Sequence, residues 1–143
     1  MTGSTLRIAA DVGELAGVRR FVRDQARRAG ADPRAVPDIV QAVDESVTNA
    51  IVHGYGGADG TVEIEVVAQG RALVVRLRDQ APPFDPTRVP TPDTSAPLEA
   101  RRPGGMGVHL ARQMADGVTY RRVNGTNELT LVKECIELGG GGC

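Results

Sequence analysis

One short stretch, DESVTNAIVHGYGG at residues 44–57, constrains this chain more than any other. Glu45, Asn49 and His53 recur in it at a spacing of four residues, ahead of a glycine-rich exit. In a helix, at about 100° per residue, these side chains fall within about 80° of one another, and the apolar residues, such as Val47, point the opposite way. The stretch therefore predicts a helix with one face in the core and one polar face.

The polar face of this predicted helix carries an acid, a carboxamide and an imidazole. A solvated helix surface normally carries Lys, Glu and Arg, which favour helix formation, whereas Asn disfavours a helix interior. The face is therefore either a functional site or only a polar surface, and its own residues leave both interpretations open.

The composition limits the chain to one compact domain. With 143 residues, 41% of them hydrophobic, it is long enough for a single core and too short for two ordinary domains. Aromatic residues make up only 3%, so the core must be built from Val, Leu, Ile and Ala, which pack well between helices and a sheet. We expect one α/β domain over residues 1–138 and a flexible Gly-rich tail over residues 139–143.

Charge and hydropathy disfavour several classes of partner. The net charge of −1 gives no attraction toward nucleic acid, although arginine doublets form local basic spots. There is no run of about 18 apolar residues and no charged-then-apolar leader, so we expect a cytoplasmic protein without membrane contact. Cys135 and Cys143 are too few for a disulfide framework or a zinc site, and we expect both to be reduced.

Hydrophobic periodicity and turn residues predict an alternation of strands and helices. The expected elements are a strand at 5–10, helices at 13–29 and 33–53, a hairpin at 61–79, a helix at 104–117 and a hairpin at 118–135. The two hairpins turn at Gly70 and at Asn124-Gly125. The proline-rich stretch between them, residues 79–105, predicts either a functional lid or a disordered segment.

Three polar features follow one another along the chain. Glu45 and Asn49 lie on a predicted helix, Asp79 ends a predicted strand, and glycines at 104–107 open the next helix. Glycines at a helix N-terminus suit phosphate binding, although a tight turn is the simpler interpretation. Asp79 alone is an ordinary turn residue. An amide oxygen of Asn49 beside phosphates would suit Mg²⁺, which keeps several waters.

Taken in order, the motifs ESVTNAIVHGYGG, RLRDQAPPFDP, PGGMGVHLAR and GTNELTLVKE resemble the Bergerat-fold ATPases, which include gyrase, heat-shock chaperones and histidine kinases. The similarity is strongest to the small bacterial anti-sigma factor serine kinases, and it covers about residues 5–134. The resemblance implies an α/β (α+β) fold in two layers. A mixed, mostly antiparallel sheet would carry about three helices on one face.

The resemblance also implies roles for individual positions. Asn49 resembles the Mg²⁺ ligand, and Glu45 resembles the base that takes a proton from a partner's serine hydroxyl. Asp79 resembles the carboxylate that accepts a hydrogen bond from the adenine amino group, and Thr126 the threonine that reaches adenine through water. The other positions implied to contact the nucleotide are His53, Ala81, Phe84, Gly104, Gly105, Met106, Gly107 and Val108.

Some of these positions have a second interpretation. His53 is similar to a pocket-lining position, but a lone histidine without a base role fits a structural part better. Arg101 and Arg102 either reach the γ-phosphate or stay solvated. Ala81 stands where the family usually has glycine, so its Cβ would crowd the adenine edge or a bound water; this bears on nucleotide affinity and not on the fold.

The function implied by the resemblance is a serine/threonine protein kinase that binds ATP and Mg²⁺. Such a protein phosphorylates a STAS-type antagonist, sequesters a sigma factor and forms a homodimer. The alternative is a nucleotide-gated binding module without turnover. The catalytic domain of a histidine kinase is disfavoured, because no helical hairpin bearing a phosphoacceptor histidine precedes the motifs.

Overall fold

The structure, a computed structural model, describes residues 3–83 and 115–136. The elements along the chain are β1 (Ser4–Ala9), a short 3-10 turn η1 (Val12–Glu14), α1 (Leu15–Arg28), α2 (Val36–Asn49), a π-helical turn η2 (Ala50–Tyr55), β2 (Thr61–Gln69), β3 (Ala72–Asp79), β4 (Gly117–Val123) and β5 (Thr126–Glu134).

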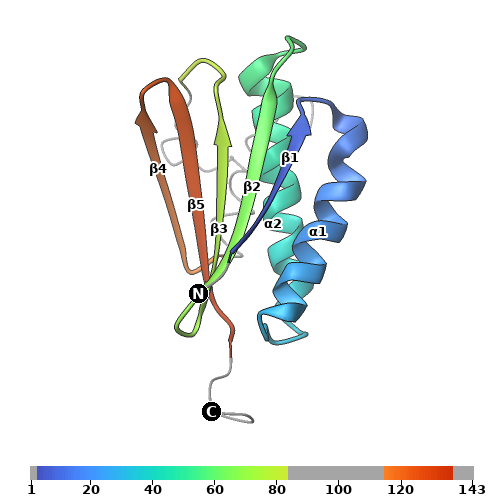
Figure 1. The fold of residues 1–143 in the computed structure, drawn as a ribbon, viewed down its shortest axis with the longest axis vertical. Helices are drawn as coiled ribbons and strands as arrows, with labels where there is room; N and C mark the ends of the chain where they lie inside the picture. The colour runs from blue at the N-terminus through green and yellow to red at the C-terminus, as the bar shows by residue number, and fades with distance from the viewer. Residues whose placement is uncertain (1–2, 84–114, 137–143) are drawn as a thin grey trace, which may run out of the picture.

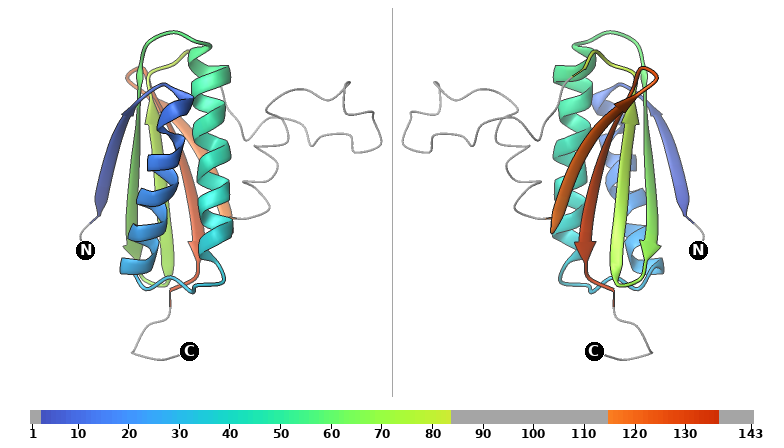
Figure 2. Two further views of the ribbon diagram at one scale, coloured as in Figure 1. Left: turned by 90° about the vertical axis from the view of Figure 1, so that its right-hand side faces the viewer. Right: turned by 90° about the vertical axis from the view of Figure 1, so that its left-hand side faces the viewer.

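The strands form one five-stranded sheet in the order β1-β2-β3-β5-β4 (Figure 1). Helices α1 and α2 cover one face of this sheet (Figure 2), which confirms the predicted two-layer α/β arrangement. The described strands pair antiparallel throughout, so the expectation of a mixed sheet was wrong for this part of the chain. The described residues contain two long helices instead of three, because the helix expected at 104–117 lies almost wholly outside them.

Both predicted hairpins are confirmed. The β4–β5 turn places Asn124 at φ 51° and Gly125 at φ 80°. Two left-handed residues in a row make the tight turn whose twist matches that of the flanking strands. This turn fixes the register in which β5 pairs with β4, and β5 pairs with β3 on its other side.

The core between the two layers is aliphatic, as the composition predicts. Helix α1 buries a row of side chains at a spacing of four, namely Val18, Val22 and Ala26. Val47 lies on the corresponding buried face of α2. The largest fully buried side chains are Ile64, Leu73, Val18, Val22, Val43, Val47, Val62 and Val75. The assignment of the apolar face of α2 to the core is therefore confirmed.

Helix α2 is shorter at both ends than the sequence predicts. It begins at Val36, because the residues before it form a turn in which the Ala35 N–H donates to the carbonyl of Asp32 at 2.8 Å. At its other end the chain continues as the π turn η2, where the Gly56 N–H donates to the carbonyl of Ile51 at 3.2 Å. A π turn contains more residues than an α turn, so the row of side chains along α2 does not continue through it.

No helix in the described ranges is long and apolar enough to span a membrane. Cys135 is a free thiol, and burial raises its pKa, which keeps it protonated and unreactive. Cys143 lies outside the described residues.

Candidate functional site

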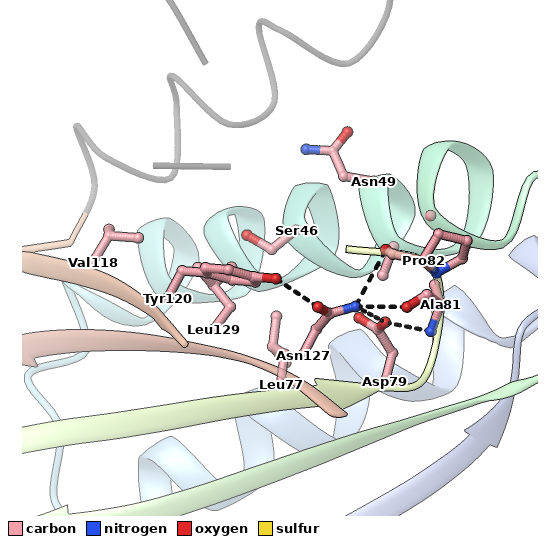
Figure 3. A pocket seen from close by; sticks show the side chains of 12 residues that line it. Ser46, Asn49, Leu77, Asp79, Ala81, Pro82, Val118, Tyr120, Asn127 and Leu129 are labelled. Atoms are coloured by element: carbon pink, nitrogen blue, oxygen red, sulfur yellow. Dashed lines mark hydrogen bonds between the residues drawn. The ribbon is translucent and has the colours of Figure 1, made fainter. Parts of the chain in front are cut away.

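A cavity lies between the C-terminal half of α2 and the ends of β3, β4 and β5 (Figure 3). Its enclosed part measures about 50 Å³ over the described residues, which is room for roughly three water molecules. The lining residues are Ser46, Asn49, Ala50, Gly54, Leu77, Asp79, Ala81, Pro82, Val118, Tyr120, Asn127 and Leu129. The walls are thus mostly apolar, with a few polar groups that converge from the helix and the sheet.

Asn49 supplies the polar group on the helix side. It is the last residue of α2 and only 8% exposed, and its Nδ2 is buried without a hydrogen-bond partner in the described part of the chain. Leaving a buried amide donor unsatisfied costs about 1–3 kcal/mol, so native proteins keep few such groups. A ligand in the cavity would satisfy this amide, and turning the carboxamide over would present its oxygen in place of its nitrogen.

Asp79 and Asn127 supply the polar groups on the sheet side. They lie directly opposite each other where β3 and β5 pair. Oδ1 of Asp79 accepts hydrogen bonds from the Ala81 N–H at 3.0 Å and from Nδ2 of Asn127 at 2.9 Å (Figure 3). Oδ1 of Asn127 in turn accepts from the hydroxyl of Tyr120 at 2.6 Å and from Arg122 at 2.8 Å. The end of β3 is therefore held by a connected hydrogen-bond network.

Tyr55 fixes the π turn against this end of the sheet. Its hydroxyl donates to the carbonyl of Thr61 at 2.7 Å and accepts from the N–H of Gln80 at 2.8 Å. Its ring covers Gly60 so closely that a Cβ there would overlap the ring. The turn η2, β2 and the residue after Asp79 are thereby joined, which sets the position of the carboxylate relative to α2.

Ala81 lines the cavity and is 2% exposed. A Cβ added to Gly54 would lie 3.2 Å from the Cβ of Ala81. The methyl group of Ala81 is thus accommodated because residue 54 is a glycine, and it takes up part of the cavity wall.

The structure brings three of the predicted site residues together at one cavity and places two others, Glu45 and His53, outside it. Asn49, Asp79 and Ala81 line one cavity. Glu45 lies one turn before Asn49 on α2, half-buried, and does not line this cavity. His53 is exposed, because the π turn moves it out of the row formed by Glu45 and Asn49.

Thr126 lies away from this cavity. It lines a shallow hollow that it shares with Arg78 and Asp79, because successive side chains of a strand point to opposite faces. Asp79 therefore borders both the cavity and this hollow. Asn127, which the sequence did not predict as a site residue, donates to Asp79 inside the cavity, and the water-mediated contact of Thr126 with adenine stays a prediction. Strand alternation could have identified Asn127, since it shares a face of β5 with Leu129.

The remaining predicted positions lie outside the described residues. They are Phe84, Arg101, Arg102, Gly104, Gly105, Met106, Gly107 and Val108.

The opposite face of the same strands carries a network of ion pairs. Arg78 bonds Glu63 at 3.0 Å, Glu65 at 3.0 Å and Glu128 at 2.8 Å, and Arg121 bonds Glu128 at 2.7 Å. Burial raises the pKa of Glu128, but the hydrogen bonds from the two arginines outweigh it and leave the pKa lowered. These pairs join β2, β3, β4 and β5 behind the cavity and support the strand ends that carry its polar groups.

No group of three or more His, Cys, Asp or Glu side chains within residues 3–83 and 115–136 could hold a metal ion. A cation in the cavity would therefore take few protein ligands, the amide of Asn49 among them. Mg²⁺ suits such a place, since it keeps several waters and binds substrate phosphates.

Comparison with protein families finds a match over residues 8–133, to a family described as the histidine kinase-like ATPase domain. Serine-protein kinase RsbW of Listeria monocytogenes is 34% identical over 119 residues, which are 80% of this chain and 76% of that protein. Anti-sigma F factor of Clostridium acetobutylicum is 28% identical over 107 residues, 72% of each chain. Serine/threonine-protein kinase BtrW of Bordetella bronchiseptica is 28% identical over 89 residues, which span 63% of its length.

Among solved structures, the fold is similar to the RsbU and RsbW domains of Rv1364c from Mycobacterium tuberculosis. The TM-score is 0.68 at 19% identity, and the similarity covers 94% of this chain and 33% of that one. This likeness confirms the fold that the motifs predicted.

Proposed function

Because this chain belongs to the family of histidine kinase-like ATPase domains, we propose that it is an ATP-dependent serine/threonine protein kinase that acts as an anti-sigma factor. Two of the relatives are named as protein kinases and one as an anti-sigma factor. The observation that carries the proposal is that Asn49, whose buried Nδ2 has no partner within residues 3–83 and 115–136, and Asp79 line the same cavity.

The two sides of the cavity suit the two ends of a nucleotide. Asp79, whose Oδ1 accepts from Ala81 and Asn127, would accept a hydrogen bond from the adenine amino group. Asn49 would hold Mg²⁺ through its amide oxygen, with water and phosphate oxygens completing the coordination. When bound, the metal neutralises charge on the phosphates.

Glu45 is the proposed general base. It lies on α2 one turn from Asn49, and no hydrogen bond or ion pair fixes its side chain within the described residues. It would accept the proton of a serine hydroxyl on a partner protein as that oxygen attacks the terminal phosphate. Phosphoryl transfer depends mainly on positioning and charge neutralisation, so this base has a modest task.

The partners follow from the same proposal. The substrate would be a STAS-type antagonist protein, and the sequestered partner a sigma factor. We propose that the protein works as a homodimer in the cytoplasm, and that residues 1–138 form its one functional domain. The positions expected to contact the nucleotide outside the described residues, including Gly105 and Gly107, belong to this proposal as well.

The test is transfer of labelled γ-phosphate from ATP to an antagonist captured from the native cell in the presence of ATP or ADP. Glu45→Gln should keep ATP binding and lose transfer, because the amide has no basic oxygen to take the proton. Asp38→Asn, an exposed acid in the first turn of the same helix, is the matched control and should transfer at the parent rate.

Two outcomes would contradict the assignment. Transfer by Glu45→Gln at the parent rate would remove Glu45 from the reaction. ATP binding by the parent without any transfer to a captured antagonist would indicate a nucleotide-gated binding module in place of a kinase.

A further inference from the structure

We infer that Asn127 is the positioning residue for nucleobase recognition, because it holds one oxygen of Asp79 and leaves the other as the acceptor available to a base. The inference rests on the proposed function, since it concerns the same ATP site. It adds a residue that the sequence motifs did not identify and a way to measure its role.

Asn127 uses its whole hydrogen-bonding capacity. Nδ2 donates to Oδ1 of Asp79 at 2.9 Å and to the carbonyl of Ala81 at 3.0 Å (Figure 3). Oδ1 accepts from Tyr120 at 2.6 Å and from Arg122 at 2.8 Å. A carboxamide has two N–H donors and two acceptor lone pairs, so all four are engaged.

These partners also fix which way the carboxamide points. Turned over, it would direct an N–H group at Arg122, which only donates, and its oxygen at the carboxylate of Asp79 and the carbonyl of Ala81, which only accept. Three of the four contacts would become repulsive, and only the Tyr120 hydroxyl could turn to accept. Asn127 is 6% exposed, so water has little access to replace them. The residue therefore presents a fixed N–H donor to Asp79.

Asp79 keeps one carboxylate oxygen for a ligand. Its Oδ1 accepts from both the Ala81 N–H and Asn127, whereas no described residue donates to its Oδ2. A half-turn of the carboxylate only exchanges its two equivalent oxygens, so in either orientation one oxygen accepts both bonds and the other is left for a ligand. An ionised carboxylate only accepts hydrogen bonds. The base that binds here must donate, as the amino group of adenine does and the carbonyl of hypoxanthine or guanine does not.

Asn127 also holds the cavity wall in place. Asn127 and Arg122 both donate to the carbonyl of Ala81, each at 3.0 Å. The chain leaving β3 therefore follows one path past the carboxylate. Selection for a hydrogen-bonding base is strongest when the polar groups of the site cannot move to accept a wrong one.

The experiment compares ATP with inosine triphosphate, which carries a carbonyl oxygen where adenine carries the amino group. Isothermal titration is run on the parent, on Asn127→Leu and on Thr130→Val, a control on the opposite face of β5. The parent should prefer ATP by about tenfold or more. Asn127→Leu should bind ATP about tenfold more weakly and inosine triphosphate almost unchanged, so that the preference approaches one.

The ratio of the affinities for ATP and inosine triphosphate tests the role of Asn127, because a purely structural role would leave this ratio unchanged. Each protein is measured at a temperature at which circular dichroism shows it folded. If folded Asn127→Leu keeps the parent's preference, the inference is overturned and the proposed function stands. A parent that binds neither nucleotide would overturn both.

Asn127→Asp provides a second test that keeps the size of the side chain. It places two carboxylates against each other, which then share a proton as the pH falls, because two like charges at this distance cannot both ionise. The shared proton restores an O–H donor to Asp79. The charged or titratable groups facing the pair within the described residues are Arg122 and Tyr120 on β4, whereas α2 presents only the uncharged Ser46 and Asn49.

The affinity of Asn127→Asp for ATP should therefore rise toward the parent value as the pH is lowered from about 8 to about 5.5. The parent measured over the same range supplies the baseline. If the variant and the parent change in parallel, Asn127 does not act through Asp79 and the inference fails.

Discussion

Asn49→Leu should stabilise the protein without nucleotide and destroy its response to nucleotide. The Nδ2 of Asn49 is buried without a partner in the described residues, and removing such a donor recovers about 1–3 kcal/mol. Leucine is also the better helix former, by a few tenths of a kcal/mol. The side chains are of similar size, and the site borders a cavity, so leucine can be accommodated.

The expected shift follows from these free energies. For a protein of this size, 1 kcal/mol corresponds to about 2–4 °C in Tm, so the variant should melt about 3–13 °C higher than the parent. Saturating ATP and Mg²⁺ reverse the order, because ligand at 1,000 times Kd stabilises the parent by about 4.1 kcal/mol and the variant not at all. Differential scanning calorimetry with and without nucleotide measures both effects.

Two controls accompany this experiment. Thr48→Ala, on the same turn, removes a hydroxyl that already donates to the carbonyl of Asp44 at 2.7 Å, and its Tm should change little. A chelator should abolish the effect of ATP on the parent. The reasoning is refuted if Asn49→Leu is no more stable than the parent without nucleotide, or if it keeps a chelator-sensitive response to ATP.

Two further predictions concern the frame around the cavity. Gly60→Ala should lower the free energy of unfolding in urea by about 1–3 kcal/mol, because its Cβ would displace the anchored ring of Tyr55. The control Gly17→Ala on α1, which has open space around it, should raise this free energy by about 1 kcal/mol. Equal effects of the two substitutions would contradict this prediction. The pKa of Glu128 is lowered from its ordinary value of 4.5, so its ionised carboxylate stabilises the fold at every pH above 4.5. This contribution is lost as the pH falls through the lowered pKa. The stability of Glu128→Gln, measured against pH, should therefore lie below the parent at neutral pH and converge with it in acid, and a constant difference would count against the ion pairs.

The sequence predicted this fold well where one pattern decides one element. The apolar row of α1, the alternation in β2 and β3, and the Asn124-Gly125 turn each have a single compatible structure, and each is present. The end of α2 was predicted less well. A spacing of four places His53 beside Asn49 only if the α-helix continues, and the change to a π turn depends on the contacts of Tyr55 with β2 and the end of β3, which no local pattern reveals.

The site shows the same division between local and long-range information. Asn49 and Asp79 were found because each carries a distinctive side chain within a motif, and the structure places both at one cavity. The place of Asn127 depends instead on the register of β5 against β3, where a shift of one residue reverses which face a side chain occupies. A motif matched by residue type therefore points to Thr126 and does not reveal that Asn127 faces the cavity beside Asp79.

The two sides of the cavity differ in a way that bears on how it works. On the sheet side, Asp79 and Asn127 are satisfied by partners that the fold itself supplies, so this side is already arranged before a ligand arrives. On the helix side, Nδ2 of Asn49 has no partner among the described residues and destabilises the protein until a group accepts its hydrogen bond. If the proposed function holds, the preorganised sheet side would select the base. The helix side would then supply most of the stabilisation on binding, because its buried donor gains a partner there. Stability should therefore respond more to Mg²⁺ and phosphates than to the base, and adenosine alone should raise the Tm far less than ATP with Mg²⁺.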